Sequence, residues 1–218
     1  MAYASDFIGA TVMAPSASAS KLVRYILDKG IAGVPPLSSA ESLAQEYLID
    51  KSYESHDRRV KSLIRWETSK NFTVGFITGL GGLVTLPVSI PSALGASWII
   101  QARMAGAIAH IYGHQLTDDR VRTFVLLSLA GDSAKEALKG AGVKLGQKLT
   151  ERAVAQIPGR ALIEINKYIG FRLLTKAGER GIVNISKAVP VVGGLIGGSF
   201  DAVACRVVGR TAERLFRR

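Results

Sequence analysis

The chain has 218 residues, 28 of them basic and 17 acidic, and its formal net charge is +11 with histidine neutral. This length allows a core that needs no disulfide or metal, and the single cysteine excludes an internal disulfide and fits a reducing compartment. The charge favours an acidic partner. Because only 7% of the residues are aromatic, stacking platforms for nucleic acid are few, and we expect an anionic membrane surface or an acidic protein instead.

The first 20 residues contain no lysine or arginine and end in a Ser/Ala run, so they lack the charged start of a secretory signal. We expect residues 1–20 to be a disordered tail and residues 21–218 to form one helical domain. Apolar residues recur with helical spacing from Lys21 onward, where Ser20 can cap the first helix and Gly30 can end it.

Capping residues mark the next two helix starts. Ser38 and Glu41 have the spacing of a capping box, in which the hydroxyl and the carboxylate satisfy free backbone amides reciprocally. Ser55 and Asp57 begin a third helix. The sequence therefore predicts three helices before the apolar centre of the chain, counting the one that starts near Lys21.

The stretch 71–102 contains no ionisable side chain, so it must be shielded from water by protein or by lipid. Pro87 and Pro91 each remove a backbone donor, which predicts an apolar segment over 73–86, a bend, and a second helix ending at Gly113. A membrane-spanning helix needs about 20 apolar residues, and 73–86 is shorter. The sequence leaves open whether this stretch enters a bilayer.

Beyond the apolar centre, Thr117 is predicted to cap a deeply buried helix that ends or kinks at a Gly-Asp-Ser sequence. Asp132 or Ser133 of that sequence can cap the helix that follows. Two amphipathic helices are expected over 143–157 and 160–176, separated by a Pro-Gly pair.

The last part of the chain repeats the pattern of the apolar centre. A short segment over 181–189 leads to Pro190, which is expected to open the final helix. A shift of 99 positions places Pro91 on Pro190 and Gly95 on Gly194, which allows an internal duplication. The predicted fold is all-α, a single-domain bundle with two Pro-broken, Gly-rich apolar helical hairpins at its centre.

Three strings, from about residue 35 to the C-terminus, together resemble the EcsC family. They are GFITGLGGLVTLPVSIPSALGASWIIQARMAGAIAHIYG, LLSLAGDSAKEALKGAGVKLG and GFRLLTKAGERGIVNISKAVPVVGGLIGGSFDAV. The family takes its name from a bacterial protein encoded beside the two components of an ABC exporter. The resemblance implies association with such a transporter and a cytoplasmic location at the inner face of the membrane, and it implies no catalytic residues.

The C-terminal helix offers the best predicted binding surface. Its basic residues recur at near-helical spacing beside apolar ones: Arg206, Arg210, Arg214, Arg217 and Arg218. A basic amphipathic helix suits an anionic membrane surface. The alternative is a solvated face on a packed helix. Arg103 is a further candidate, and we expect it to pair with Asp201 unless that acid faces water.

Two sets of residues could carry chemistry. Asp132, Ser133 and Asp201 could form the site of a hydrolase if they converge on a concave pocket, although helix capping explains the first two as well. His110 and His114 have the spacing of a zinc pair, but Gly113 is expected to end the helix between them. We expect no metal or cofactor.

These observations favour a non-enzymatic, membrane-associated protein, peripheral or partly inserted, that assists or regulates a transport or envelope process. The alternatives are a soluble hydrolase acting on lipid or envelope material and, last, a basic nucleic-acid-binding protein. Vesicle binding, a catalytic pocket and salt-dependent retention on DNA would distinguish the three.

Overall fold

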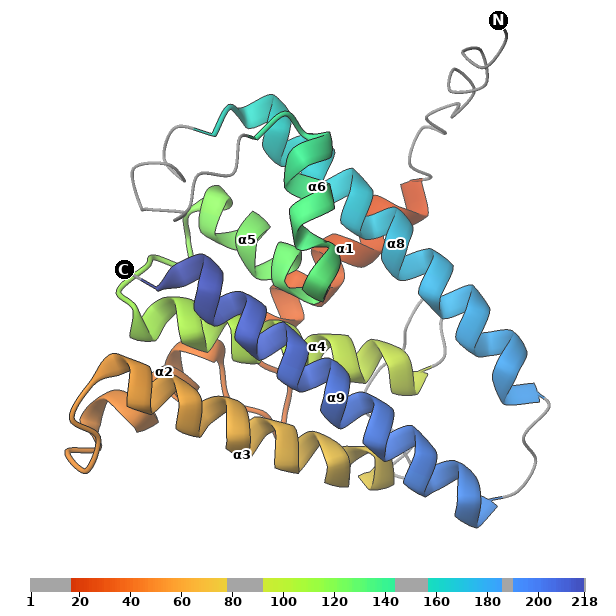
Figure 1. Ribbon diagram of the computed structural model, residues 1–218, viewed down its shortest axis with the longest axis horizontal. Coiled ribbons are helices and arrows are strands. Elements are labelled where there is room, and N and C mark those ends of the chain that lie inside the picture. The colour runs from red at the N-terminus through yellow and green to blue at the C-terminus, as the bar shows by residue number, and fades with distance from the viewer. Residues whose placement is uncertain (1–16, 78–91, 144–156, 186–189, 218) are drawn as a thin grey trace, which may run out of the picture.

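The computed structural model describes residues 17–77, 92–143, 157–185 and 190–217 (Figure 1), with side chains described except in 17–19, 70–77, 92–94, 176–185 and 190–201. All regular structure in this part of the chain is helical, which confirms the predicted all-α class. The helices are α1 (Ala17–Ala32), α2 (Ala40–Ile49), α3 (His56–Ile77), α4 (Ser92–Ile111), α5 (Asp119–Leu129), the 3-10 turn η1 (Gly131–Ser133), α6 (Ala134–Gly140), α8 (Gly159–Ile185) and α9 (Pro190–Phe216).

Helix α4 lies at the centre of the fold, in contact with α1, α2, α3, α5 and α9. Every side chain from Ser97 to Ala109 is buried, so neighbours surround α4 on all sides. A helix that is apolar around its whole circumference needs such an environment. The described end of the uncharged stretch, residues 95–102, is therefore shielded by protein. Among the described helices, none combines the length and the apolar character needed to cross a membrane.

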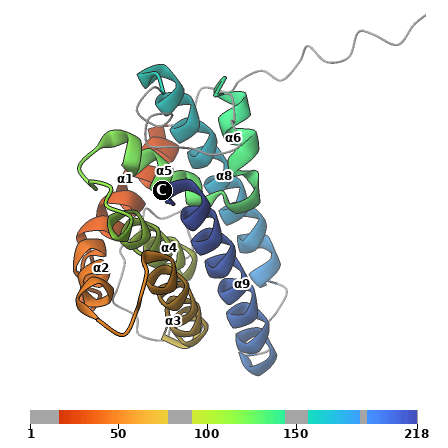
Figure 2. The same ribbon diagram turned by 60° about the vertical axis from the view of Figure 1, so that its left-hand side comes forward.

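Helices α3 and α9 pack along each other, and both also contact α4 (Figures 1 and 2). They run antiparallel, because Asp57 near the start of α3 pairs with Arg217 after the end of α9. Close approach depends on Gly209, where an added Cβ would lie 2.8 Å from Cγ1 of Ile64. Helix α8 packs elsewhere, against α1, α5 and α6.

Proline and glycine set several helix ends where they were predicted. Pro190 is the first residue of α9, and Gly113, with φ of 82°, follows the end of α4. The bend predicted over 87–90 lies outside the described residues, as does the end of the second predicted segment, 186–189, so the hairpins as units stay a prediction. The two proline-led helices, α4 and α9, do contact each other. The internal duplication stays a prediction.

Other predicted boundaries are wrong. Helix α1 already begins at Ala17, so the predicted tail is helical over its last four residues, where alanine favours a helix. Helix α8 continues through the predicted break to Ile185. The caps also lie one residue later than predicted. Ser39 caps α2 by accepting from the Ser42 amide, and Asp118 caps α5 by accepting from the Arg120 amide.

Candidate functional site

One side of α9 carries a row of exposed arginines. Arg206, Arg210, Arg214 and Arg217 are exposed, whereas Cys205, Val208 and Ala212 between them are buried. At 3.6 residues per turn, the four arginines lie within one face of the helix. Val203, which is 63% exposed, lies on the same face. The four described arginines of the predicted binding surface therefore share one exposed face, with Val203 beside them. Arg218 lies outside the described residues.

The four arginines of this row differ in their partners. Arg217 is paired with Asp57, and Arg214 lies 3.8 Å from a carboxylate oxygen of Asp132. Arg206 and Arg210 form no ion pair with any residue that the structure describes. The charge of Arg206 and Arg210 is therefore available to an external partner.

Helix α3 extends the basic surface. Its exposed side chains include Arg58, Lys61 and Arg65. Helices α3 and α9 lie side by side (Figure 2), and both contact α4, so we infer that their exposed sides adjoin each other away from α4. Only Arg58 of these three is ion-paired within the described part, to Glu54 at 3.3 Å. We call this surface, formed by exposed residues of α3 and α9, the basic face.

Arg103 is not part of the basic face. Its side chain is buried, and its Nη1 lies 3.3 Å from Oε2 of the equally buried Glu67. Its Nε and Nη2 donate to the carbonyl and the hydroxyl of Ser38, at 2.6 and 2.7 Å. The described carboxylate partner of Arg103 is thus Glu67. The side chain of Asp201 lies outside the described residues, so its predicted pairing remains a prediction.

Two tyrosines border these charged clusters. Burial raises the pKa of Tyr47 to about 12, and the nearby Glu67 carboxylate adds to the rise. Burial also raises the pKa of Tyr112, which donates a hydrogen bond of 2.8 Å to Asp57. Asp57 therefore holds both a neutral phenol and Arg217. This arrangement fixes the end of α9 against the start of α3.

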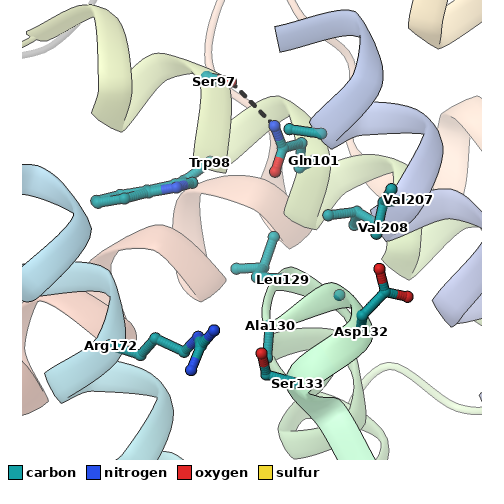
Figure 3. Close-up of a pocket in the computed structure, with 12 residues that line it drawn as sticks. Ser97, Trp98, Gln101, Leu129, Ala130, Asp132, Ser133, Arg172, Val207 and Val208 are labelled. Carbon is teal, nitrogen blue, oxygen red and sulfur yellow. Dashed lines mark hydrogen bonds between the residues drawn. The ribbon is translucent and has the colours of Figure 1, made fainter. Parts of the chain in front are cut away.

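A cavity of about 280 Å³ lies between α4, η1, α8 and α9 (Figure 3). Both Asp132 and Ser133 line it, as the hydrolase hypothesis requires. Neither side chain caps a helix, so the predicted capping role is wrong. The reason is local: Ser133 has φ −81° and ψ 2°, not the extended backbone of a capping residue.

The cavity contains polar groups that sequence reasoning missed. Gln101 and Ser97 are both buried, and Nε2 of Gln101 donates to Oγ of Ser97 at 3.0 Å. Across the cavity, Nη1 of Arg172 donates to the Tyr168 hydroxyl at 3.2 Å, whereas its buried Nε has no hydrogen-bond partner among the described residues. The i, i+4 spacing of Ser97 and Gln101 within an otherwise apolar helix was a usable signal. Nothing in the sequence links Arg172 to them.

A hydrolase site would need more than Asp132 and Ser133 in the cavity, and the side chain of Asp201, its third predicted member, lies outside the described residues. A serine nucleophile needs an adjacent base, and no histidine is among the residues that line the cavity. Asp132 is 86% exposed and lies beside Arg214, and Figure 3 shows its carboxylate on the α9 side, away from Arg172. Ser133 therefore has no described group that could take its proton.

The two histidines have separate environments. The His110 ring is 3.3 Å from the Gln45 side-chain amide, and Nε2 of His114 is 2.9 Å from the Phe216 carbonyl oxygen. His114 also packs on the Phe216 ring, beyond the end of α4. No group of three or more potential metal ligands occurs among the described residues. His110 and His114 therefore have different partners and pack separately near the C-terminal end of α4.

The chain belongs to the EcsC protein family, whose model matches residues 16–218. This confirms the resemblance seen in the sequence, and the match begins earlier than the expected start near residue 35. No similar protein was found among curated proteins, and none among solved structures.

Proposed function

We propose that this member of the EcsC family is a non-enzymatic peripheral protein that binds an anionic membrane surface through its basic face and there assists or regulates a transport or envelope process. The observation that carries the proposal is the row of exposed arginines on α9, two of which have no described ion-pair partner. The family resemblance supports the link to transport and a position at the inner face of the membrane.

The energetics favour a diffuse electrostatic contact. Each arginine or lysine near an anionic bilayer surface contributes about 1 kcal/mol to binding. The basic face carries Arg206 and Arg210 on α9 and Lys61 and Arg65 on α3 without described ion pairs. Four such cations supply enough attraction for reversible binding, and the exposed Val203 adds apolar area beside them.

The position of the face is fixed by the fold. Helix α9 packs on α3 and α4 with its opposite side, so the arginines cannot turn inward without breaking the core. The pairing of Asp57 with Arg217 and Tyr112 anchors the end of the helix. Membrane binding through this face therefore needs no unfolding and no insertion of a helix.

Vesicle flotation tests the proposal. The wild-type protein is expected to float with vesicles of equal parts phosphatidylglycerol and phosphatidylcholine and to stay behind with phosphatidylcholine alone. Raising the salt to about 0.5 M should release it, because screening shortens the reach of surface charges. Absence of binding to both vesicles, or equal binding to both, would contradict the proposal.

A pair of matched variants locates the contact. Arg206→Gln/Arg210→Gln should weaken binding to anionic vesicles roughly 30-fold, the equivalent of about 1 kcal/mol per arginine. Arg24→Gln/Arg160→Gln removes two exposed arginines of α1 and α8, which lowers the net charge equally. Equal losses in the two variants would show that net charge acts alone. Binding to duplex DNA that only the first variant loses would assign the face to nucleic acid instead.

A further inference from the structure

We propose that the cavity between α4, η1, α8 and α9 binds a small amphiphilic anion, a carboxylate or a phosphate monoester that carries one short alkyl chain. The proposal is independent of membrane binding, because it rests on the groups that line the cavity and not on the basic face. It adds a ligand site to a protein for which the family match names none.

The cation of the site is Arg172. Its guanidinium lines the cavity and points towards Ala130 and Ser133 (Figure 3). Only the hydrogen bond to Tyr168 engages it among the described residues, and its Nε is buried without an acceptor. A buried donor without a partner is costly. An anion in the cavity can accept hydrogen bonds from the outer nitrogens of the guanidinium, and a carboxylate or phosphate can accept two in parallel.

A neutral polar group, the Ser133 hydroxyl, completes the anion end of the site. The Ser133 hydroxyl makes no hydrogen bond to a described residue and faces the same space as Arg172. It can donate to a second oxygen of the anion. The Asp132 carboxylate also lines the cavity, but it lies beside Arg214 at 3.8 Å. The acid therefore limits the cavity on the α9 side without occupying the space in front of Arg172.

The rest of the lining suits an alkyl chain. Trp98, Leu129, Val207 and Val208 form apolar walls, and the buried amide of Gln101 is engaged with Ser97. The volume of about 280 Å³ is at the low end of the roughly 300–1,000 Å³ that small-molecule sites occupy. This size accommodates one short chain with its head group and excludes a phospholipid with two long chains.

Trp98 provides a direct probe of the cavity. The chain has two tryptophans, and Trp66 is 53% exposed on α3, so Trp66→Phe leaves Trp98 as the sole emitter. Titration with octanoate and with octyl phosphate should change Trp98 emission saturably. Octanol, octyltrimethylammonium and inorganic phosphate, which each lack one required feature, should bind at least 10-fold more weakly. Calorimetry with the unmodified chain should give the same order.

Two variants test the residues in this Trp66→Phe background. Arg172→Gln should weaken octyl phosphate binding at least 10-fold, and Ser133→Ala should weaken it by about 3-fold. Arg206→Gln on the basic face should leave it unchanged. Thermal unfolding verifies that each variant is folded, and Ser133→Ala still tests the site if Arg172→Gln does not fold.

Three outcomes would overturn the proposal. The first is the absence of a saturable emission change with either anion. The second is octanol binding as tightly as octanoate, which would make the cavity merely apolar. The third is inorganic phosphate binding as tightly as octyl phosphate, which would remove the apolar part of the ligand. Loss of vesicle binding with retained octanoate binding would refute the proposed membrane role alone.

Discussion

Arginine side chains have opposite environments on the two proline-led helices of this protein, α4 and α9. Helix α4 is buried on all sides, and its one arginine, Arg103, is held by Glu67 and Ser38. In the part of α9 whose side chains the structure describes, residues 202–216, only one side is buried, and the arginines point outward with few partners. The number of neighbours around a helix, and not the residue type, decides whether an arginine is structural or available for binding.

The difference has an energetic cause. A guanidinium removed from water must recover its lost hydration from fixed hydrogen bonds and an opposite charge, which makes its partners indispensable. An exposed guanidinium keeps its water and gains little from a carboxylate nearby. Substitutions around Arg103 should therefore affect stability, whereas substitutions along the outer side of α9 should affect binding.

The largest effect is expected from Glu67→Ala, which leaves Arg103 buried without its carboxylate. Breaking one partner of a buried pair costs about 3–5 kcal/mol, so the free energy of unfolding should fall by this amount in urea titrations. The control is Glu54→Ala, which removes the exposed partner of Arg58 and should cost less than about 0.5 kcal/mol. Similar losses in both variants would contradict the contrast.

Ser38→Ala should have the next largest effect, because it removes the hydroxyl that accepts from Nη2 of Arg103. A hydrogen bond to a charged group contributes about 1.5–3 kcal/mol. The neighbouring Ser39 caps α2, and Ser39→Ala should cost about 1 kcal/mol. Urea unfolding of the two variants compares them directly. If Ser39→Ala lowered the free energy of unfolding more than Ser38→Ala, the helix cap would contribute more to stability than the hydrogen bond to Arg103.

Ser38 and Ser39 show which part of the structure could be predicted from the sequence and which part could not. Either residue can accept a hydrogen bond at the start of α2, so a capping pattern alone cannot choose between them. Arg103, distant in sequence, binds Ser38 and leaves the cap to Ser39. The C-terminal end of α4 and the start of α9 were predictable, because glycine and proline restrict the backbone locally. Contacts between residues that are distant in sequence, such as Arg103 and Ser38, were not predictable.

The residues that line the cavity show the same contrast between local sequence signals and contacts made by distant residues. Asp132 and Ser133 were candidates because a carboxylate beside a hydroxyl can orient a nucleophile, and they do line the cavity. Arg172 and Gln101 come from other helices, and no spacing in the sequence relates residues that only tertiary packing brings together. The exposed row on α9 was predictable, since one helical period joins its members. Sequence periodicity thus identifies a face within one helix more readily than a cavity between four.

The inner side of α9 can be tested at Gly209, where an added methyl would meet Cγ1 and Cγ2 of Ile64 at 2.8 and 3.0 Å. Gly209→Ala should cost about 1–3 kcal/mol through overpacking. In a double-mutant cycle, Ile64→Ala should recover part of that loss. The control, Gly140→Ala, adds a methyl with no neighbour within 4 Å and should be neutral or slightly stabilising. Additive costs at Gly209 and Ile64 would contradict the contact.

The smallest effect is expected on the outer side of the same helix. Arg206→Gln/Arg210→Gln removes two exposed side chains without a described ion pair, so the free energy of unfolding should change by less than about 0.5 kcal/mol per residue. Urea midpoints at low and high salt should shift alike for this variant and the wild type, since no folded-state pair is screened. A loss above about 1 kcal/mol per arginine would make these residues structural, like Arg103, and would remove the basis for assigning them to a membrane surface.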